Sequence, residues 1–320
     1  MLQQQVLNFM NYLKSAHTSQ KYLEHTYKKY DVVDPEKNSY QNSYRFLYYL
    51  QHGQHFYQTG NQANLIVQPI LFFYGMVHLL KACLLTRRPD YPENTSMLAH
   101  GVSTRKRKKQ QYEFLQDEVK LQHKGLFPYF TKHLCGVEKF PYEKVTMKQL
   151  LAAIPEVNSL FNLYSGESVL LPVASKGSYT LSIPRKILDN YHMTENAFLT
   201  KLSSYQLTIA EKQLHKETIE LSVENELSPI SKGPFFYHSA EETFYLPASR
   251  EYFSTNHEIM NHYLLLYNLS MICRYETEWW GDLLHTLPTV DYPFIETFLQ
   301  ATSEKVPFLL GYFLYQQYDT

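Results

Sequence analysis

The feature that most constrains this chain is a change in the period of its hydrophobic residues. Apolar residues recur every three to four positions up to residue 164, alternate with polar residues from 168 to 248, and return to the longer spacing after residue 255. The longer spacing is typical of amphipathic helices, and the alternation is typical of β-strands. We therefore predict a mainly α, α+β fold in which a bundle of N- and C-terminal helices carries an inserted small antiparallel sheet.

The same change predicts how the chain divides into substructures. A single core stops growing efficiently at roughly 250 to 300 residues, and this chain has 320. We expect a helical part at 1–164, a small β-containing section at 165–250, and C-terminal helices at 251–320 that pack on the first part.

Proline, glycine and capping residues set the expected bounds of the elements. Pro69 and Pro307 suit the first turn of a helix, Thr194 suits an N-cap, and Thr255 with Glu258 forms a capping box. The prolines of 86–101 predict a long loop. Helices are expected at 40–59, 69–85, 104–124, 146–153, 155–164, 195–202, 259–275, 291–300 and 307–317. Strands are expected at 168–174, 178–183, 205–211, 217–223 and 243–248.

Composition excludes several classes of protein. A formal charge of −1 excludes a globally basic nucleic-acid binder, although a local basic patch stays open. The three cysteines are far apart, so neither a disulfide framework nor a zinc site is expected, and we predict no metal and no cofactor. The N-terminus lacks the pattern of a signal peptide, and the apolar stretch 65–85 is interrupted by polar residues. We expect a cytoplasmic protein that does not enter the membrane.

The densest group of cations is the best candidate for a functional site. The window 87–109 contains seven Arg or Lys residues against Asp90 and Glu93, a local excess of five positive charges that would attract a nucleotide, RNA or an acidic protein surface. We also expect Thr104 to cap a following helix and to place free amides near the anion. The alternative is a solvated helix start whose charges pair with nearby acids. The candidate ligand-binding residues are Arg87, Arg88, His100, Thr104, Arg105, Lys106, Arg107, Lys108 and Lys109.

His78 and Lys81 are further candidates for ligand binding. They lie three residues apart in an otherwise apolar helical segment, and hence on nearly the same face. They would either point together into a cavity, or serve as a hydrogen-bonded core histidine and a lysine that reaches solvent by its alkyl stem.

A third candidate is the pair Arg45 and His52, an arrangement that some helical ribonucleases use on the scissile phosphate. The same spacing recurs at Arg185 with His192 and at Arg250 with His257, so chance accounts for it readily. No phosphate-binding glycine loop and no nucleophile elbow is present. The sequence therefore contains no complete catalytic site.

Three long segments resemble the YaaC-like family of Bacillus and related Firmicutes. They are FFYGMVHLLKACLL, PDYPENTSMLAHGVSTRKRKKQQYEFLQDEVKLQHKGLF and HYLLLYNLSMICRYETEWW. The resemblance implies a cytoplasmic protein often encoded beside the gene for IMP dehydrogenase, which makes that enzyme a candidate partner. The tyrosine-rich helix followed by YGMVHLLKACLL also resembles the HEPN class of helical bundles, some of which cleave RNA.

We therefore predict a non-enzymatic binding or regulatory protein that presents residues 100–109 to an anionic partner, and that is able to form a homodimer. The alternative hypothesis is a metal-independent ribonuclease of the HEPN type that uses Arg45 and His52.

Overall fold

The computed structural model describes residues 2–105, 112–175, 177, 179–205, 207–253 and 256–319. It forms two compact units, Met1–Met147 with His262–Thr320 and Lys148–Asn261, so the second unit is inserted into the first along the chain. Helices dominate the first unit and an antiparallel sheet dominates the second. The predicted mainly α, α+β class is confirmed. The domain ranges 1–164, 165–250 and 251–320 stay a prediction; the short helices of 148–165 and the segment 251–261 fall in the second unit.

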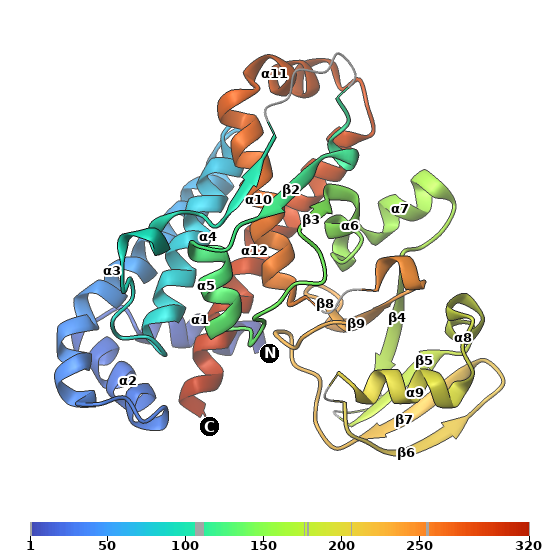
Figure 1. Cartoon of the computed structure of the whole chain (residues 1–320), viewed down its shortest axis with the longest axis horizontal. Helices are drawn as coiled ribbons and strands as arrows, with labels where there is room; N and C mark the ends of the chain where they lie inside the picture. Colours follow the sequence, from blue (N-terminus) through green and yellow to red (C-terminus); the bar gives the residue numbers. More distant parts are fainter. Residues whose placement is uncertain are drawn as a thin grey trace. The chain divides into compact units, whose positions relative to one another are not determined.

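Long helices build the first unit (Figure 1). Helix α3 packs against α2 and α4, and α12 packs against α1, α2, α3 and α4. The two N-terminal helices and the helices Leu126–His133 and Thr277–Thr286 were not predicted. The helices of this unit are α1 (Leu2–Tyr12), α2 (Ala16–Lys29), α3 (Pro35–Gln62), α4 (Gln68–Leu85), α5 (Leu126–His133), most of α10 (Glu258–Tyr275), α11 (Thr277–Thr286) and α12 (Asp291–Asp319), with short 3₁₀ turns η1 (Thr95–Leu98) and η2 (Phe114–Gln116).

Helices α3 and α4 form a closely packed hairpin. A Cβ atom on Gly53 would lie 2.6 Å from Leu79 Cγ, and one on Gly75 would lie 2.8 Å from Tyr57 Cδ2, so glycine permits the close approach at both positions. Helix α4 is, in the described chain, the one helix long and apolar enough to cross a membrane, and 67% of it is buried within the protein. That burial fits the predicted core helix.

The predicted third helix at 104–124 is wrong. This region contains β1 (Val102–Thr104), η2 and β2 (Glu118–Leu121), and a three-stranded antiparallel sheet forms when β2 also pairs with β3 (Lys144–Thr146). Tertiary contacts override the helical spacing, because the buried Asp291 carboxylate accepts hydrogen bonds from the amides of Phe114 and Leu115, at 3.0 and 3.3 Å. Thr104 pairs with Val119 as a strand residue, so its predicted role as a helix cap is wrong too.

The predicted start of a separate closing helix at Pro307 is also wrong. Helix α12 runs unbroken from Asp291 to Asp319 with Pro307 inside it. Proline removes one backbone hydrogen bond from a helix, but packing of α12 against several other helices keeps the chain helical on both sides. The predicted cap Thr255 lies outside the described residues.

An antiparallel sheet with the strand order β6-β7-β5-β4-β9-β8 forms the second unit. All five predicted strands are present, although β6 begins four residues later than expected, and β8 was not predicted. The strands are β4 (Leu170–Ser175), β5 (Thr180–Pro184), β6 (Ile209–Leu214), β7 (Thr218–Val223), β8 (Phe236–His238) and β9 (Thr243–Pro247). The helical turns are α6 (Met147–Leu151), η3 (Pro155–Val157), α7 (Asn158–Ser165), α8 (Ile187–Tyr191), α9 (Glu195–Ser203) and η4 (Arg250–Tyr252).

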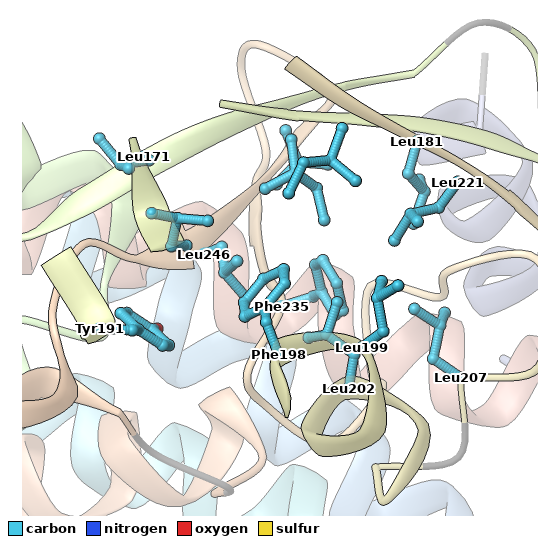
Figure 2. Packing of buried hydrophobic residues seen from close by; sticks show 14 of the residues in the cluster. Leu171, Leu181, Tyr191, Phe198, Leu199, Leu202, Leu207, Leu221, Phe235 and Leu246 are labelled. Carbon is cyan, nitrogen blue, oxygen red and sulfur yellow. The ribbon is translucent and has the colours of Figure 1, made fainter. Parts of the chain in front are cut away.

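Helix α9 covers one face of this sheet. Thr194 caps it as predicted, since its hydroxyl accepts a hydrogen bond from the amide of Ala197. Figure 2 shows Phe198 and Leu202 of α9 pointing toward Leu181 and Leu221 of the sheet, and all four side chains are buried. The alternating pattern of the strands therefore marks the core of this unit correctly.

Candidate anion-binding site

The α3–α4 hairpin places polar and aromatic side chains of both helices on one side. Tyr49, His52 and Phe56 follow each other at three and four residues on α3. Tyr74, His78 and Lys81 follow at four and three residues on α4. Residues at these spacings share one face of a helix. All six therefore lie along one seam of the packed hairpin.

His78 lies at the centre of this seam. Its ring centroid is 5.3 Å from that of His52 and 5.6 Å from that of Phe56, on which it stacks with an interplanar angle of 13°. The Tyr49 ring is 5.9 Å away, and Lys81 Nζ lies 5.6 Å from the centroid of that same ring. His78 thus lies against the rings of Tyr49 and Phe56, and Lys81 lies against the Tyr49 ring as well.

His100 and Arg274 bring two further basic groups to the same place. The His100 ring packs on Phe73 at 5.0 Å, and its backbone carbonyl accepts a hydrogen bond from the Tyr263 hydroxyl at 2.9 Å. Arg274, on α10, donates to the Tyr74 hydroxyl at 3.4 Å. We call His52, His78, Lys81, His100 and Arg274 the cation cluster. Lys81 and Arg274 carry its positive charge at neutral pH, where the lowered pKa of His78 leaves that ring neutral.

The glycine after His100 holds this turn against α5. Gly101 has φ of +79°, and a Cβ atom there would lie 2.5 Å from Pro128 Cδ. An L side chain would therefore be strained and would clash. The turn at His100 and Gly101 thus fixes the position of His100.

The pKa values show that members of the cluster are desolvated near other cations. Burial lowers the pKa of Lys81 below its usual value. The pKa of His78 falls to about 4, mainly because of burial and then because of Lys81 and His52. Burial, Arg274 and Lys81 lower the pKa of His100 in that order. No carboxylate contributes to any of the three shifts.

No protein acid neutralises the cluster in the described part of the chain. None of its five members takes part in an ion pair there, and Nδ1 of His78 is buried without a hydrogen-bond partner. A desolvated cation without a counter-charge is unfavourable, and a bound anion removes that cost. The arrangement is therefore suited to holding a phosphate or a similar oxyanion.

The sequence contains one further signal for this site. No Asp or Glu occurs from Lys37 to Pro89, a stretch that contains almost all of α3 and the whole of α4. Net charge conceals this because acids elsewhere bring the total to −1. Tyr49, Phe56, Tyr74 and Arg274 are the site residues that sequence reasoning missed.

Of the predicted ligand-binding residues, the structure brings His78, Lys81 and His100 together in the cluster. Arg88 is paired with Glu93, which also accepts a hydrogen bond from the Tyr129 hydroxyl at 2.7 Å. The Arg87 guanidinium packs on the rings of Tyr30 and Phe313, and it donates to the His133 carbonyl. Thr104 and the exposed Arg105 lie at the end of β1. Lys106, Arg107, Lys108 and Lys109 lie outside the described residues.

Arg45 and His52 make separate contacts. Both are exposed on α3, where Arg45 donates to the Tyr91 carbonyl at 3.1 Å and the ring of His52 lies beside His78. No hydrogen bond joins the two among the described side chains. No group of three His, Cys, Asp or Glu residues in the described regions is placed to hold a metal ion.

Comparison with known proteins gives one match. The family model described as YaaC-like protein matches residues 11–314, nearly the whole chain. No curated protein and no solved structure matches it.

Proposed function

The chain belongs to the YaaC-like family, and from that membership and the cation cluster we propose that it is a cytoplasmic, non-enzymatic binding protein with a regulatory role, whose ligand is a phosphate-bearing anion. One observation carries the proposal. Lys81 is half-buried near His78 and His100, and no carboxylate of the described chain offsets its charge. A ligand that supplies negative charge is what this group of side chains lacks.

The aromatic walls favour a ligand that carries a base as well as a phosphate. The rings of Tyr49, Phe56 and Tyr74 surround the basic groups, and Tyr74 also contacts Arg274 through its hydroxyl. Base–aromatic stacking contributes about 1–3 kcal/mol per base in nucleic-acid binding proteins. A nucleotide or RNA uses both parts of the site, whereas an acidic protein surface uses only the charges.

The family resemblance extends the proposal to guanine-nucleotide synthesis. IMP dehydrogenase is the candidate protein partner, and the basic residues 105–109 are the candidate contact. Co-sedimentation of the two proteins, with and without a guanine nucleotide, tests this part. Equal sedimentation profiles for the mixture and for the separate proteins would remove it.

One observation favours the alternative, a metal-independent ribonuclease. His52 lies beside His78, which in turn lies near Lys81, and such groups transfer protons and hold a phosphate. Cleavage of a labelled RNA in the presence of a chelator, lost in His52→Gln, would support it. Binding without cleavage supports the non-enzymatic protein.

The binding proposal is tested by calorimetry with UMP, GMP, uridine and polyglutamate at low and moderate salt. We expect both nucleotides to bind and uridine not to bind, with affinity falling as salt rises. Lys81→Met should weaken binding of the nucleotides roughly 10- to 30-fold, the loss of one charge-assisted contact.

Lys201→Met is the matched control. Lys201 also has a pKa lowered by burial, and its Nζ lies 4.0 Å from the centroid of the Phe253 ring, but it belongs to the second unit. Its substitution should leave binding unchanged. Equal losses in the two variants, or equal binding of uridine and UMP, would contradict the proposal.

A further inference from the structure

We infer that the ligand of the cation cluster is a single-stranded oligonucleotide rather than a mononucleotide, and that its bases stack along a row of exposed tyrosines on α3. This inference rests on the proposed function and names the ligand class of the same site. We call Tyr40, Tyr44 and Tyr48 the tyrosine row.

The row leads directly to the cation cluster. Its members are spaced by four residues, and the next position in that spacing is His52. Each step of four residues advances about 6 Å along a helix, and residues so spaced are neighbours on its surface. The rings of Tyr44 and Tyr48 are 6.1 Å apart. His52 in turn contacts His78.

The three rings are unusually exposed for aromatic side chains. Their exposed fractions are 70% for Tyr40, 58% for Tyr44 and 54% for Tyr48, while Phe46 and Leu50 of the same helix are fully buried. Within the described residues, the only ring that contacts either Tyr44 or Tyr48 is the other one. The row is therefore a surface of π faces available to a partner.

Charge complementarity points to a polyanion. From Lys37 to Pro89 no carboxylate occurs, and the exposed Arg45 and His55 lie on α3 as well. Along α3, Glu36, four residues before Tyr40, is the first acid beyond the row; in space, Asp90 lies near Tyr27, which Asn42 and Arg45 of α3 also approach. The favourable surface thus begins at Tyr40 and becomes most basic at the cluster.

A bound mononucleotide would not contact most of the tyrosine row. One base can stack on the rings beside His78, whereas a row about 12 Å long matches several consecutive bases whose phosphates follow the basic groups. Aromatic rings interleaved with cations are the usual means by which proteins hold single strands without reading their sequence. We expect a site for about three or four nucleotides.

The test is fluorescence anisotropy with labelled oligouridylates of two, four and eight nucleotides, together with calorimetry of UMP. Affinity should rise from UMP to the tetranucleotide and then level off. Oligothymidylates of the same lengths distinguish RNA from DNA, and binding of either supports the inference. A duplex of equal length should bind at least tenfold more weakly than the single strand, because its bases cannot stack on the row.

Substitutions in the row separate this inference from the proposed function. Tyr48→Ala and Tyr44→Ala should each weaken tetranucleotide binding roughly tenfold and leave UMP binding unchanged, with a smaller effect for Tyr40→Ala near Glu36. The corresponding Phe variants should bind like the wild type. Tyr179→Ala, at a tyrosine of the second unit that is 55% exposed, is the matched control and should have no effect.

Three results would overturn the inference. One is UMP binding with no gain in affinity on lengthening, which leaves the proposed function standing. Another is no binding of UMP or of any oligonucleotide, in which case both proposals fail. The third is a homodimer in sedimentation equilibrium that Tyr44→Ala dissociates, because the row would then be an interface between two copies.

Discussion

The α3–α4 hairpin of the first unit and the β6–β7 strands of the second unit hold their basic residues differently. In the second unit, Lys212 pairs with Glu195 at 2.8 Å, and His215 lies 3.4 Å from Glu220. In the first unit, the hairpin of α3 and α4 gathers His52, His78 and Lys81 with no acid among the described neighbours. A net charge near zero therefore hides a marked local separation of charge.

The difference shows where an external partner is needed. A partly exposed ion pair such as Lys212 with Glu195 contributes about 0–1 kcal/mol, and each charge lies beside its counter-charge. Lys81 instead has a lowered pKa, because burial disfavours its charged form and no anion offsets that. The hairpin therefore has an unfavourable free energy of burying Lys81 that a bound anion can offset. The Lys212–Glu195 pair of the second unit already contains its counter-charge.

The largest effect is expected when a carboxylate is introduced into the α3–α4 hairpin, which would remove its difference from the ion pairs of the second unit. Tyr49→Glu places a carboxylate near Lys81, whose Nζ lies 5.6 Å from the centroid of the Tyr49 ring. We expect UMP binding to weaken roughly 100-fold, because the new charge pairs with Lys81 and repels the phosphate. Calorimetry measures the loss. Tyr49→Phe is the control and should bind within about threefold of wild type; a Glu variant that binds equally well would refute the electrostatic account.

A smaller effect is expected from widening the hairpin. A Cβ atom at Gly75 would lie 2.8 Å from Tyr57 Cδ2 and 3.1 Å from Phe56 Cβ, so Gly75→Ala forces the helices or the rings to move. We expect a loss of about 1–3 kcal/mol in the free energy of unfolding, measured by urea denaturation, and weaker UMP binding, because Phe56 stacks on His78.

Gly281→Ala is the control for this prediction. A Cβ atom there would meet nothing within 4 Å, and the position is inside α11. Alanine should stabilise the helix by about 0.5–1 kcal/mol. Stabilisation by both substitutions would show that the hairpin is packed more loosely than the structure indicates.

The smallest effect concerns pH. The pKa of His78 is about 4 in the folded chain against 6.5 for an unperturbed histidine, so the unfolded chain binds the proton more readily between these values. The stability that neutral His78 provides above pH 6.5 is therefore lost as pH falls toward 4. The full difference corresponds to about 3 kcal/mol, and screening by solvent reduces it to roughly 1–2 kcal/mol.

Urea denaturation of wild type and His78→Phe at pH 7 and pH 4.5 measures this loss. The variant should lose about 1–2 kcal/mol less than the wild type between the two values. Gly281→Ala removes no titratable group from α11 and should keep the pH dependence of the wild type. An identical pH dependence in His78→Phe and the wild type would show that His78 is not desolvated.

The sequence pattern predicted secondary structure correctly where residues close together in the chain determine it. Thr194 caps α9, and the alternation in residues 218–223 gives β7, because capping and pleat act over a few residues. The predicted helix at 104–124 is wrong because Asp291, far away in the sequence, accepts hydrogen bonds from the backbone amides of Phe114 and Leu115. The predicted helix start at Pro307 is wrong because the packing of α12 on several helices outweighs one lost backbone hydrogen bond.

The site was predictable only in part, for a related reason. The spacing of His78 and Lys81 placed them on one face of α4, and His100 was among the candidates from the basic window 87–109. Arg274 could not be linked to them because it lies far along the chain on α10. Arg88 was predicted to bind a ligand, but the structure pairs it with Glu93. The sequence shows both residues and does not show that they pair.

The pKa of Lys81, followed by NMR of the 13Cε signal in lysine-labelled protein and assigned with Lys81→Met, tests the central claim most directly. Without ligand we predict a value below 10.5, and on addition of UMP a rise, because the phosphate supplies the missing charge. A value at or above 10.5 without ligand, unchanged by UMP, would mean that the chain already neutralises this lysine and that the cluster is not an anion site.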